Sequence, residues 1–281
     1  MVEGNGHETG TLLAEDGCPL FTQVWRPEAD PRGIVVLIHG LGEHSDRYPH
    51  LREALLEAGY ILATYDLRGH GRSGGRRGHI DSFGQYRSDL SLALDAFRAL
   101  APGSPLFVYG HSLGSVIALD YVLSGNDGLT GCVLSGAALD ASQVAPAWQV
   151  AILTMLSRVW PTFSLKVALP GALLSRDTGV CGGYDGDPLV HWMRSARLAT
   201  EGFAAVERVS ERADGMHTPA LFIHGEKDPL VPVGAARAYF EAIPARDKTM
   251  HVYADSLHEC HNDLDHEQIM ADVVAWLEAR S

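Results

Sequence analysis

The 281-residue sequence has few cysteines, an excess of acidic over basic residues and no long apolar run. Its four cysteines, Cys18, Cys132, Cys181 and Cys260, show no paired spacing, so we expect free thiols rather than a disulfide framework. A formal net charge of −13 disfavours nucleic acid as a partner, because the phosphate backbone attracts basic surfaces. No run approaches the roughly 18 apolar residues of a membrane-spanning helix. Segment 1–10 lacks the basic and apolar parts of a signal peptide, so we expect a cytoplasmic protein.

Short apolar runs recur along the chain, and runs of this kind form strands that are buried on both faces of a parallel sheet. Helical patterns at 48–58, 83–100 and 113–123 separate them, so the alternation predicts a doubly wound, mostly parallel α/β sheet. Near the N-terminus, an antiparallel hairpin is predicted to turn at Asp16 and Gly17. The predicted buried strands are 33–40, 60–67, 105–112, 131–136 and 219–225.

The alternation is interrupted between residues 140 and 206, which predicts a helical insertion in one α/β core domain formed by 1–139 and 207–281. A helix that ends at Pro161 has an apolar face, and a Gly- and Asp-rich loop, 176–188, follows it. We expect the apolar face to pack onto the main domain and to line a channel, with transient contact to a lipid surface as the alternative. The face comprises Trp148, Ile152, Met155, Leu156, Val159 and Trp160.

Residues 110–114, Gly-His-Ser-Leu-Gly, stand between a predicted strand and a predicted helix. In such a sharp turn the central Ser112 is strained and its hydroxyl is presented at the carboxyl edge of the sheet, while the flanking glycines avoid a clash. The Leu113 N–H then lies at a helix N-terminus, where it can stabilise an oxyanion. Ser112 could instead only cap the helix, but a cap needs neither glycine, so we favour a nucleophile.

A serine nucleophile needs a base, and in this strand–turn–helix context an acid and then a histidine follow the serine in the sequence. Asp228 lies just after the predicted strand 219–225, and His258 follows the next predicted strand, 248–255. Both residues therefore come to the sheet edge of Ser112, where Asp228 can hold the second ring nitrogen of His258.

Other acids and histidines lie close to this pair in the sequence. We expect Glu226 and Asp255 to be exposed loop carboxylates, since neither fits the strand ends as well. His251 falls inside a strand pattern, and His261 would begin the final helix. The spacing of the His-rich segment 258–266 is too irregular for a metal site, so we expect no metal.

The loop after the first buried strand is expected to supply the second oxyanion donor. The Leu41 N–H is the expected group, because Gly40 and Gly42 let the backbone turn this amide inward. His39 precedes the loop, and we expect it to order the loop by hydrogen bonding rather than to act as a base.

Residues 69–74 match the Gly-x-Gly-x-x-Gly pattern of a dinucleotide-binding loop. However, the match follows a later strand than such sites use, no apolar helix opens on it, and no acid ends a strand about 20 residues further on. We therefore expect no nucleotide and no other cofactor, and we interpret residues 66–71 as a tight surface turn.

Six motifs together resemble the monoacylglycerol lipases and related lysophospholipases of the α/β-hydrolase fold. They are HGLGEHSDRY, YDLRGHGRSGG, GHSLGS, DPLV, HGEKDPLVP and LHE..ND, and they extend from about residue 20 to the C-terminus. The resemblance implies a catalytic triad of Ser112, Asp228 and His258, with an oxyanion hole at the amides of Leu41 and Leu113.

The resemblance also implies that the insertion 140–206 is a cap, which forms an apolar acyl channel above the serine. In the family, the Glu and Arg that correspond to Glu43 and Arg47 hold the glycerol hydroxyls. From the residues alone, Glu43 and Arg47 could instead form a surface ion pair at the start of a helix.

We therefore expect a serine carboxylic-ester hydrolase that acts through an acyl-enzyme on a monoacylglycerol or a similar small lipid ester. A broader short-chain esterase, a lysophospholipase or a thioesterase is the alternative among enzymes. Two other classes of protein are disfavoured. A nucleotide-dependent oxidoreductase would need the glycine motif 69–74 to bind NADH, which we do not expect. A non-enzymatic relative would have lost a triad residue, whereas all three are present here. Nothing in the sequence indicates an oligomeric state.

Overall fold

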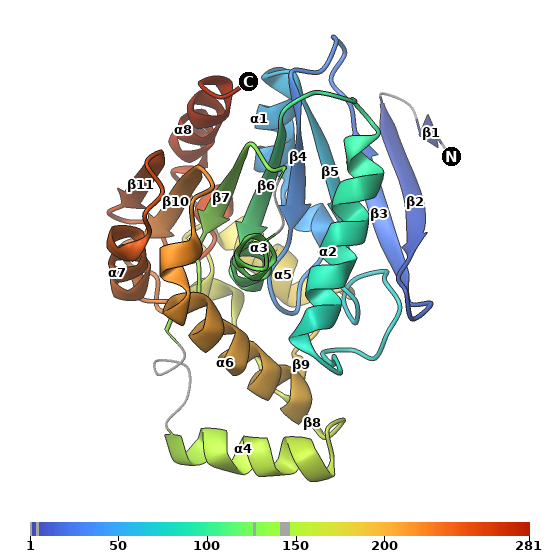
Figure 1. The fold of residues 1–281 in the computed structure, drawn as a ribbon, viewed down its shortest axis with the longest axis vertical. Coiled ribbons are helices and arrows are strands. Elements are labelled where there is room, and N and C mark those ends of the chain that lie inside the picture. Colours follow the sequence, from blue (N-terminus) through green and yellow to red (C-terminus); the bar gives the residue numbers. More distant parts are fainter. Residues whose placement is uncertain (1, 4–5, 126–127, 141–146) are drawn as a thin grey trace.

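A nine-stranded sheet forms the centre of the computed structural model, which describes residues 2–3, 6–125, 128–140 and 147–281 (Figure 1). The strand order is β1-β2-β3-β5-β4-β6-β7-β10-β11. From β5 to β11 all neighbours are parallel, whereas β1, β2 and β3 form the antiparallel edge. The strands are β1 Val2–Glu3, β2 His7–Leu13, β3 Pro19–Trp25, β4 Gly33–Ile38, β5 Tyr60–Tyr65, β6 Leu106–His111, β7 Gly131–Ser135, β10 Ala220–Gly225 and β11 Lys248–Tyr253. The predicted sheet and the N-terminal hairpin are confirmed.

Both faces of the sheet are covered, because successive side chains of each apolar strand point to opposite sides. In β4, Ile34, Val36 and Ile38 face the core beneath α2, α3 and α7, while Val35 and Leu37 face the core beneath α1 and α8. These two cores make the fold a doubly wound α/β sheet. The helices that cover it are α1 Pro49–Glu57, α2 Phe83–Arg98, α3 Leu113–Leu123, α7 Val233–Ala242 and α8 His266–Glu278.

The chain between β7 and β10 adds α4 Ala147–Val159, α5 Thr178–Gly186 and α6 Ala196–Glu211 (Figure 1). It also forms a separate two-stranded antiparallel sheet from β8 Ser164–Lys166 and β9 Met193–Ser195. The predicted end of the insertion at residue 206 falls inside α6, and residues 141–146 of the insertion lie outside the described part of the chain.

The prediction of a loop at 176–188 is wrong, since most of this segment forms the helix α5. Asp177 precedes the helix, and its carboxylate accepts the N–H groups of Gly179 and Val180, at 2.7 and 3.2 Å. This cap satisfies two of the N–H groups that a helix start leaves unpaired. Four glycines inside the helix, at 179, 182, 183 and 186, give this segment the composition of a loop.

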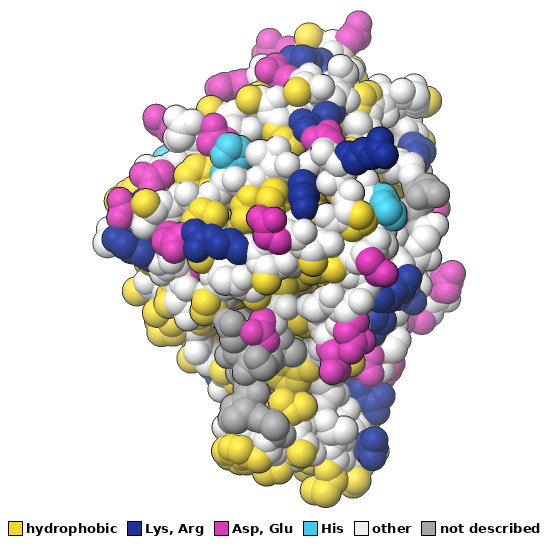
Figure 2. All heavy atoms as spheres, turned by 60° about the vertical axis from the view of Figure 1, so that its left-hand side comes forward, with side chains coloured by type: hydrophobic (Ala, Val, Ile, Leu, Met, Phe, Trp, Pro, Cys, Tyr) yellow, Lys and Arg dark blue, Asp and Glu magenta, His cyan; other side chains and the backbone are white. Residues whose placement is uncertain are grey.

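The expectation that the apolar face of α4 packs onto the main domain is wrong. Trp148, Ile152, Met155 and Val159 are 64%, 53%, 65% and 82% exposed. Instead, α4 turns Ser157 towards α6, where Arg197 Nε donates to the serine hydroxyl at 2.9 Å. Figure 2 shows hydrophobic side chains gathered at the lower end of the molecule, where α4 lies in Figure 1.

The turn 66–71 is buried, so its interpretation as a surface turn is wrong. The carboxylate of Asp66 accepts the Ser45 N–H at 2.9 Å and the Arg72 N–H at 2.7 Å. Gly71 has φ +46°, and a Cβ there would lie 2.1 Å from Asp66 Oδ2, so glycine is required. The glycines serve close packing of the turn against the loop after β4.

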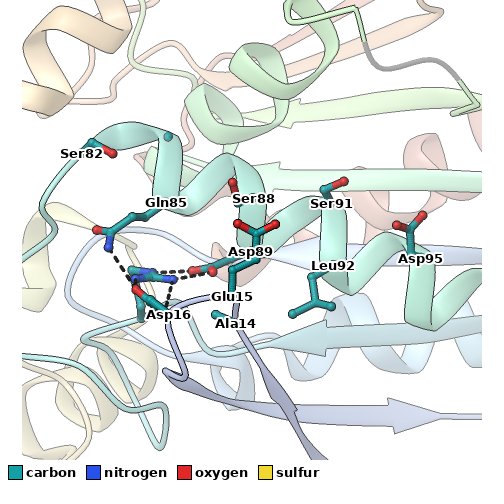
Figure 3. A pocket seen from close by; sticks show the side chains of 12 residues that line it. Ala14, Glu15, Asp16, Ser82, Gln85, Ser88, Asp89, Ser91, Leu92 and Asp95 are labelled. Carbon is teal, nitrogen blue, oxygen red and sulfur yellow. Dashed lines mark hydrogen bonds and ion pairs between the residues drawn. The ribbon is translucent and has the colours of Figure 1, made fainter.

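Arg68 of the same turn binds Asp89 in a bidentate pair, at 2.6 and 2.7 Å, and also binds Asp16 at 2.6 Å (Figure 3). A pocket of about 480 Å³ opens beside this pair, between α2 and the β2–β3 turn. Its lining includes none of the candidate site residues. Among the described residues, no helix is long and apolar enough to cross a membrane.

Candidate active site

Ser112 lies between the end of β6 and the start of α3, in the strained conformation that the sequence predicts. Its φ and ψ are 52° and −114°, and among the described residues it alone has a positive φ without being glycine. A Cβ at Gly110 would lie 2.6 Å from Gly114 O, and one at Gly114 would lie 2.0 Å from Ile38 O. The requirement for both glycines is therefore confirmed.

Asp228 and His258 meet in the loops that follow β10 and β11. His258 Nδ1 lies 2.7 Å from Asp228 Oδ2. The other oxygen, Oδ1, accepts the N–H groups of Leu230 and Val231, at 2.8 and 2.9 Å. His224 Nε2 adds a contact of 3.4 Å to Oδ2. The carboxylate is thus held in one orientation, and it must accept the proton on Nδ1 of His258, which leaves Nε2 free as a base.

The pKa shifts of Asp228 and His258 are consistent with this hydrogen bond between them. Burial alone would raise the pKa of Asp228, but His258 and the hydrogen bonds around the carboxylate hold this pKa well below its usual range. Burial alone would lower the pKa of His258, but the Asp228 carboxylate raises it above the usual value. The pair therefore combines an ionised acid with an imidazole that is more basic than in solution.

The ends of β6 and β7 bring His258 and Ser112 to the same corner of the sheet. The Ser112 N–H donates to Ser135 O at 2.8 Å, and a Cβ at the next residue, Gly136, would lie 3.1 Å from Cε1 of the His258 ring. The His258 ring also lies 4.8 Å from the ring of His111, measured between centroids. Within the described part of the chain, the Ser112 hydroxyl forms no hydrogen bond with another residue, His258 included.

The alternative acids lie at the surface, as expected. Asp255 is 60% exposed and binds Lys227 at 2.7 Å, while Glu226 binds Arg237 in an exposed ion pair. Neither carboxylate is bonded to a histidine in the described structure.

The two alternative histidines, His251 and His261, have structural positions of their own. His251 lies inside β11, as predicted. His261 does not begin the final helix, which starts at His266; it lies in the buried 3₁₀ turn Cys260–Asn262 and stacks on Tyr48 at 4.4 Å between centroids. Burial lowers the pKa of His261 to about 4, so the ring is neutral at pH 7. No group of three or more described His, Cys, Asp or Glu side chains is arranged to hold a metal ion.

The segment 39–47, which we call the oxyanion loop, follows β4 and passes beside Ser112. His39 Nε2 accepts the Leu67 N–H at 2.9 Å, so its proton is on Nδ1, which donates to Gly40 O at 2.8 Å. Burial lowers the pKa of His39, which keeps this tautomer neutral. The expectation that His39 orders the loop is confirmed.

The orientation of the Leu41 amide follows from this hydrogen bond. In a trans peptide the N–H points away from the carbonyl, so fixing Gly40 O also fixes the Leu41 N–H. A Cβ at Gly40 would lie 3.4 Å from Ser112 Cβ, which places the amide next to the candidate nucleophile. Neither this amide nor that of Leu113 donates a hydrogen bond to another described residue, so both are available to an oxyanion.

Glu43 and Arg47 do not form a surface ion pair, and that alternative is wrong. Their side chains are 4% and 8% exposed, and Arg47 Nη1 lies 2.7 Å from Glu43 Oε2. Arg47 also binds Glu259, a residue to which the sequence assigned no role. No sequence pattern connects Arg47 with a residue 212 positions away. The available signals were the position of Glu259 directly after His258 and its place in the motif LHE..ND.

A parallel doubly wound sheet with a strained serine after β6 and a His–Asp pair after its last two strands defines an α/β-hydrolase with a serine nucleophile. The Hydrolase_4 family, described as serine aminopeptidase, S33, matches residues 29–265, and the chain belongs to this family of serine hydrolases.

The chain also resembles individual named proteins along most of its length. A monoacylglycerol lipase of Mycolicibacterium smegmatis is 32% identical over 93% of each chain. The monoglyceride lipase of Homo sapiens is 29% identical and covers 96% of this chain and 90% of its own. The crystal structure of the Paleococcus ferrophilus monoacylglycerol lipase superposes with a TM-score of 0.85 and 34% identity, over 93% of this chain and 99% of that one.

Proposed function

We propose that this serine hydrolase cleaves monoacylglycerols to fatty acid and glycerol, with Ser112, Asp228 and His258 as its catalytic triad. The observation that carries the proposal is the 2.7 Å bond between His258 and Asp228 at the sheet corner where Ser112 is strained. Relatives that bear the names monoacylglycerol lipase or monoglyceride lipase support the substrate class.

The proposed reaction follows from the positions of the polar groups. His258 Nε2 removes the proton of Ser112 Oγ while the oxygen attacks the ester carbonyl carbon. The amides of Leu41 and Leu113 bind the negative oxygen of the tetrahedral intermediate. The protonated imidazole then gives its proton to the glycerol oxygen as the C–O bond breaks, and a water molecule repeats the sequence on the acyl-enzyme.

We propose that the insertion 140–206 acts as a cap over this site. Its support comes from contacts between the described part of the insertion and the loops of the site. The His191 N–H donates to Gly42 O at 2.8 Å, and Leu174 O accepts the Glu259 N–H at 2.8 Å. A cap held in this way would exclude water and line the path of the acyl chain.

The exposed face of α4 is proposed to touch lipid surfaces transiently. Val159 is followed by Trp160, which is 56% exposed, and the neighbouring β8 adds Leu165 at 51%. Exposed apolar side chains that gather on one surface mark an interaction site, and tryptophan prefers the boundary between lipid and water. A substrate with one acyl chain resides in such surfaces.

Contact of Glu43 and Arg47 with the glycerol hydroxyls stays a prediction. Glu43 Oε1 already accepts from the Gly40 N–H and the Tyr48 hydroxyl, each at 2.6 Å, and Oε2 accepts from Arg47. A hydroxyl would therefore have to bind the remaining donors of Arg47 or share an occupied carboxylate oxygen.

A hydrolysis panel tests the proposed substrate. It compares monoacylglycerols, diacylglycerols, lysophospholipids, acyl thioesters and p-nitrophenyl esters of graded chain length, with Ser112→Ala as the blank. We expect the highest kcat/KM on monoacylglycerols. Equal or higher values on lysophospholipids, thioesters or short esters would assign the enzyme to those substrate classes instead.

A further inference from the structure

Three buried charged side chains join loops that are far apart in the sequence. The Arg47 guanidinium donates to both carboxylate oxygens of Glu259, at 2.6 and 2.8 Å. The same Nη1 atom donates to Glu43 Oε2 at 2.7 Å. The side chains of Glu43, Arg47 and Glu259 are all more than nine-tenths buried. Charge-assisted hydrogen bonds thus connect the loop that carries His258 to the oxyanion loop.

Glu43 extends this connection to the backbone beside the nucleophile. Its Oε1 accepts the Gly40 N–H at 2.6 Å. A Cβ added at Gly40 would lie 2.7 Å from this oxygen and 3.4 Å from Ser112 Cβ. The carboxylate, the glycine backbone and Ser112 are therefore packed together, and the Tyr48 hydroxyl and the Arg47 guanidinium fix the orientation of the carboxylate.

Asn262 holds the far end of the cluster. Its Nδ2 donates to Glu259 Oε2 and to Arg47 O, each at 2.9 Å. The guanidinium of Arg47 also lies 4.6 Å from the centroid of the Tyr184 ring. Glu259 is thus oriented by its own neighbours and presents both oxygens to Arg47.

Stabilisation of the fold does not by itself explain why a second carboxylate, that of Glu259, is buried beside Arg47. Among the described residues, Arg47 is the one cation that pairs with Glu43 or Glu259, so the cluster has excess negative charge. Glu43 would neutralise Arg47 by itself, and burying a further carboxylate costs desolvation free energy that pairing offsets only in part. A bidentate partner does, however, fix the plane of the guanidinium.

We propose that Glu259 is a positioning residue that holds the oxyanion loop against Ser112 in the geometry that the reaction requires. This inference rests on the proposed function, because it takes the Leu41 amide as an oxyanion donor. Small displacements of such a donor reduce the rate of the chemical step more than they reduce substrate binding.

The same carboxylate faces the proposed base. Burial lowers the pKa of His258, Asp228 raises it most, and Glu259 and Glu43 raise it further. The buried ring of His111 lies beside His258, and the buried ring of His261 lies beside that of His111. Burial lowers the pKa of both His111 and His261, so both are neutral at pH 7. Loss of the Glu259 charge should therefore shift the acid side of the rate profile to lower pH.

The test compares Glu259→Gln with Asp89→Asn, which alters an equally buried bidentate pair with Arg68 at the pocket between α2 and the β2–β3 turn, whose lining includes none of the candidate site residues (Figure 3). Both variants should lower Tm. We expect Glu259→Gln to reduce kcat by roughly 10- to 100-fold with KM within about twofold, on a monoacylglycerol and on a p-nitrophenyl ester alike. Its affinity for an alkyl boronic acid, which mimics the tetrahedral intermediate, should fall by a similar factor. Asp89→Asn should leave kcat within about twofold.

Three results would overturn the inference: unchanged kcat in Glu259→Gln, equal loss of kcat in Asp89→Asn, or a loss confined to the monoacylglycerol, which would indicate direct glycerol contact. If Glu259→Gln does not fold, Asn262→Ala removes the outer support and should lower kcat several-fold with the same pattern. Ser112→Ala separates the two proposals. Full activity in Ser112→Ala would refute the proposed function, whereas its inactivity beside a normal Glu259→Gln would refute only the positioning role.

Discussion

Replacing Asp228 with Asn exchanges one carboxylate oxygen for an NH₂ group, and the structure determines which one. Oδ1 accepts two backbone N–H groups, from Leu230 and Val231, at 2.8 and 2.9 Å. The amide oxygen of Asn must stay there. In the flipped orientation the Asn NH₂ group, itself a donor, would face these two backbone N–H donors and leave them buried without a partner, at about 1–3 kcal/mol each. The NH₂ group therefore takes the place of Oδ2, 2.7 Å from His258 Nδ1.

This exchange reverses the hydrogen bond to the base. The NH₂ group donates to Nδ1, so the imidazole carries its proton on Nε2, the atom that has to accept the proton of Ser112. The wrong tautomer costs about 10⁴-fold in kcat in serine protease triads, which corresponds to about 5 kcal/mol of activation free energy. We expect a loss of that order here, with KM changed by less than about threefold.

The assay is steady-state hydrolysis of a p-nitrophenyl ester, with thermal unfolding to show that the variant is folded. Asp255→Asn is the matched control, because Asp255 is 60% exposed and its Lys227 pair is worth little, so kcat should stay within about twofold. A loss of less than about tenfold in Asp228→Asn, or a larger loss in Asp255→Asn, would refute the assignment of the acid.

Three further predictions follow from the site and from α4. Ser112→Ala should fold normally and lose on the order of 10⁶-fold in kcat, and more than a few per cent of residual activity in a pure sample would contradict a serine nucleophile. The value of kcat/KM should fall as pH drops and His258 becomes protonated, with a midpoint above about 6.5, because Asp228 raises the pKa; a flat profile between about pH 5 and 8 would argue against a histidine base. The double variant Trp148→Ser, Met155→Ser should bind phosphatidylcholine vesicles more weakly in a sedimentation assay while its hydrolysis of a short soluble ester stays unchanged, whereas Leu13→Ser, at an equally exposed site, should bind normally; equal binding of all three proteins would remove the lipid-surface proposal.

Features that depend on neighbours in the sequence were predictable. The buried strands appear as short apolar runs, and the strain at Ser112 follows from the sharp turn between β6 and α3 together with its two glycines. Asp228 and His258 could be placed at the same edge because carboxyl ends of parallel strands meet there. In each case, local backbone geometry leaves few alternatives.

Features that depend on what surrounds a segment were decided only by the tertiary structure. The pattern of α4 revealed an apolar face but not that this face is exposed, since periodicity does not state what covers a helix. The glycine-rich α5 is a helix in spite of poor propensity because Asp177 caps its start. Arg47 finds Glu259 across 212 positions because folding brings two loops together, and the pairing of buried charges depends on distance in space, which no spacing along the chain encodes.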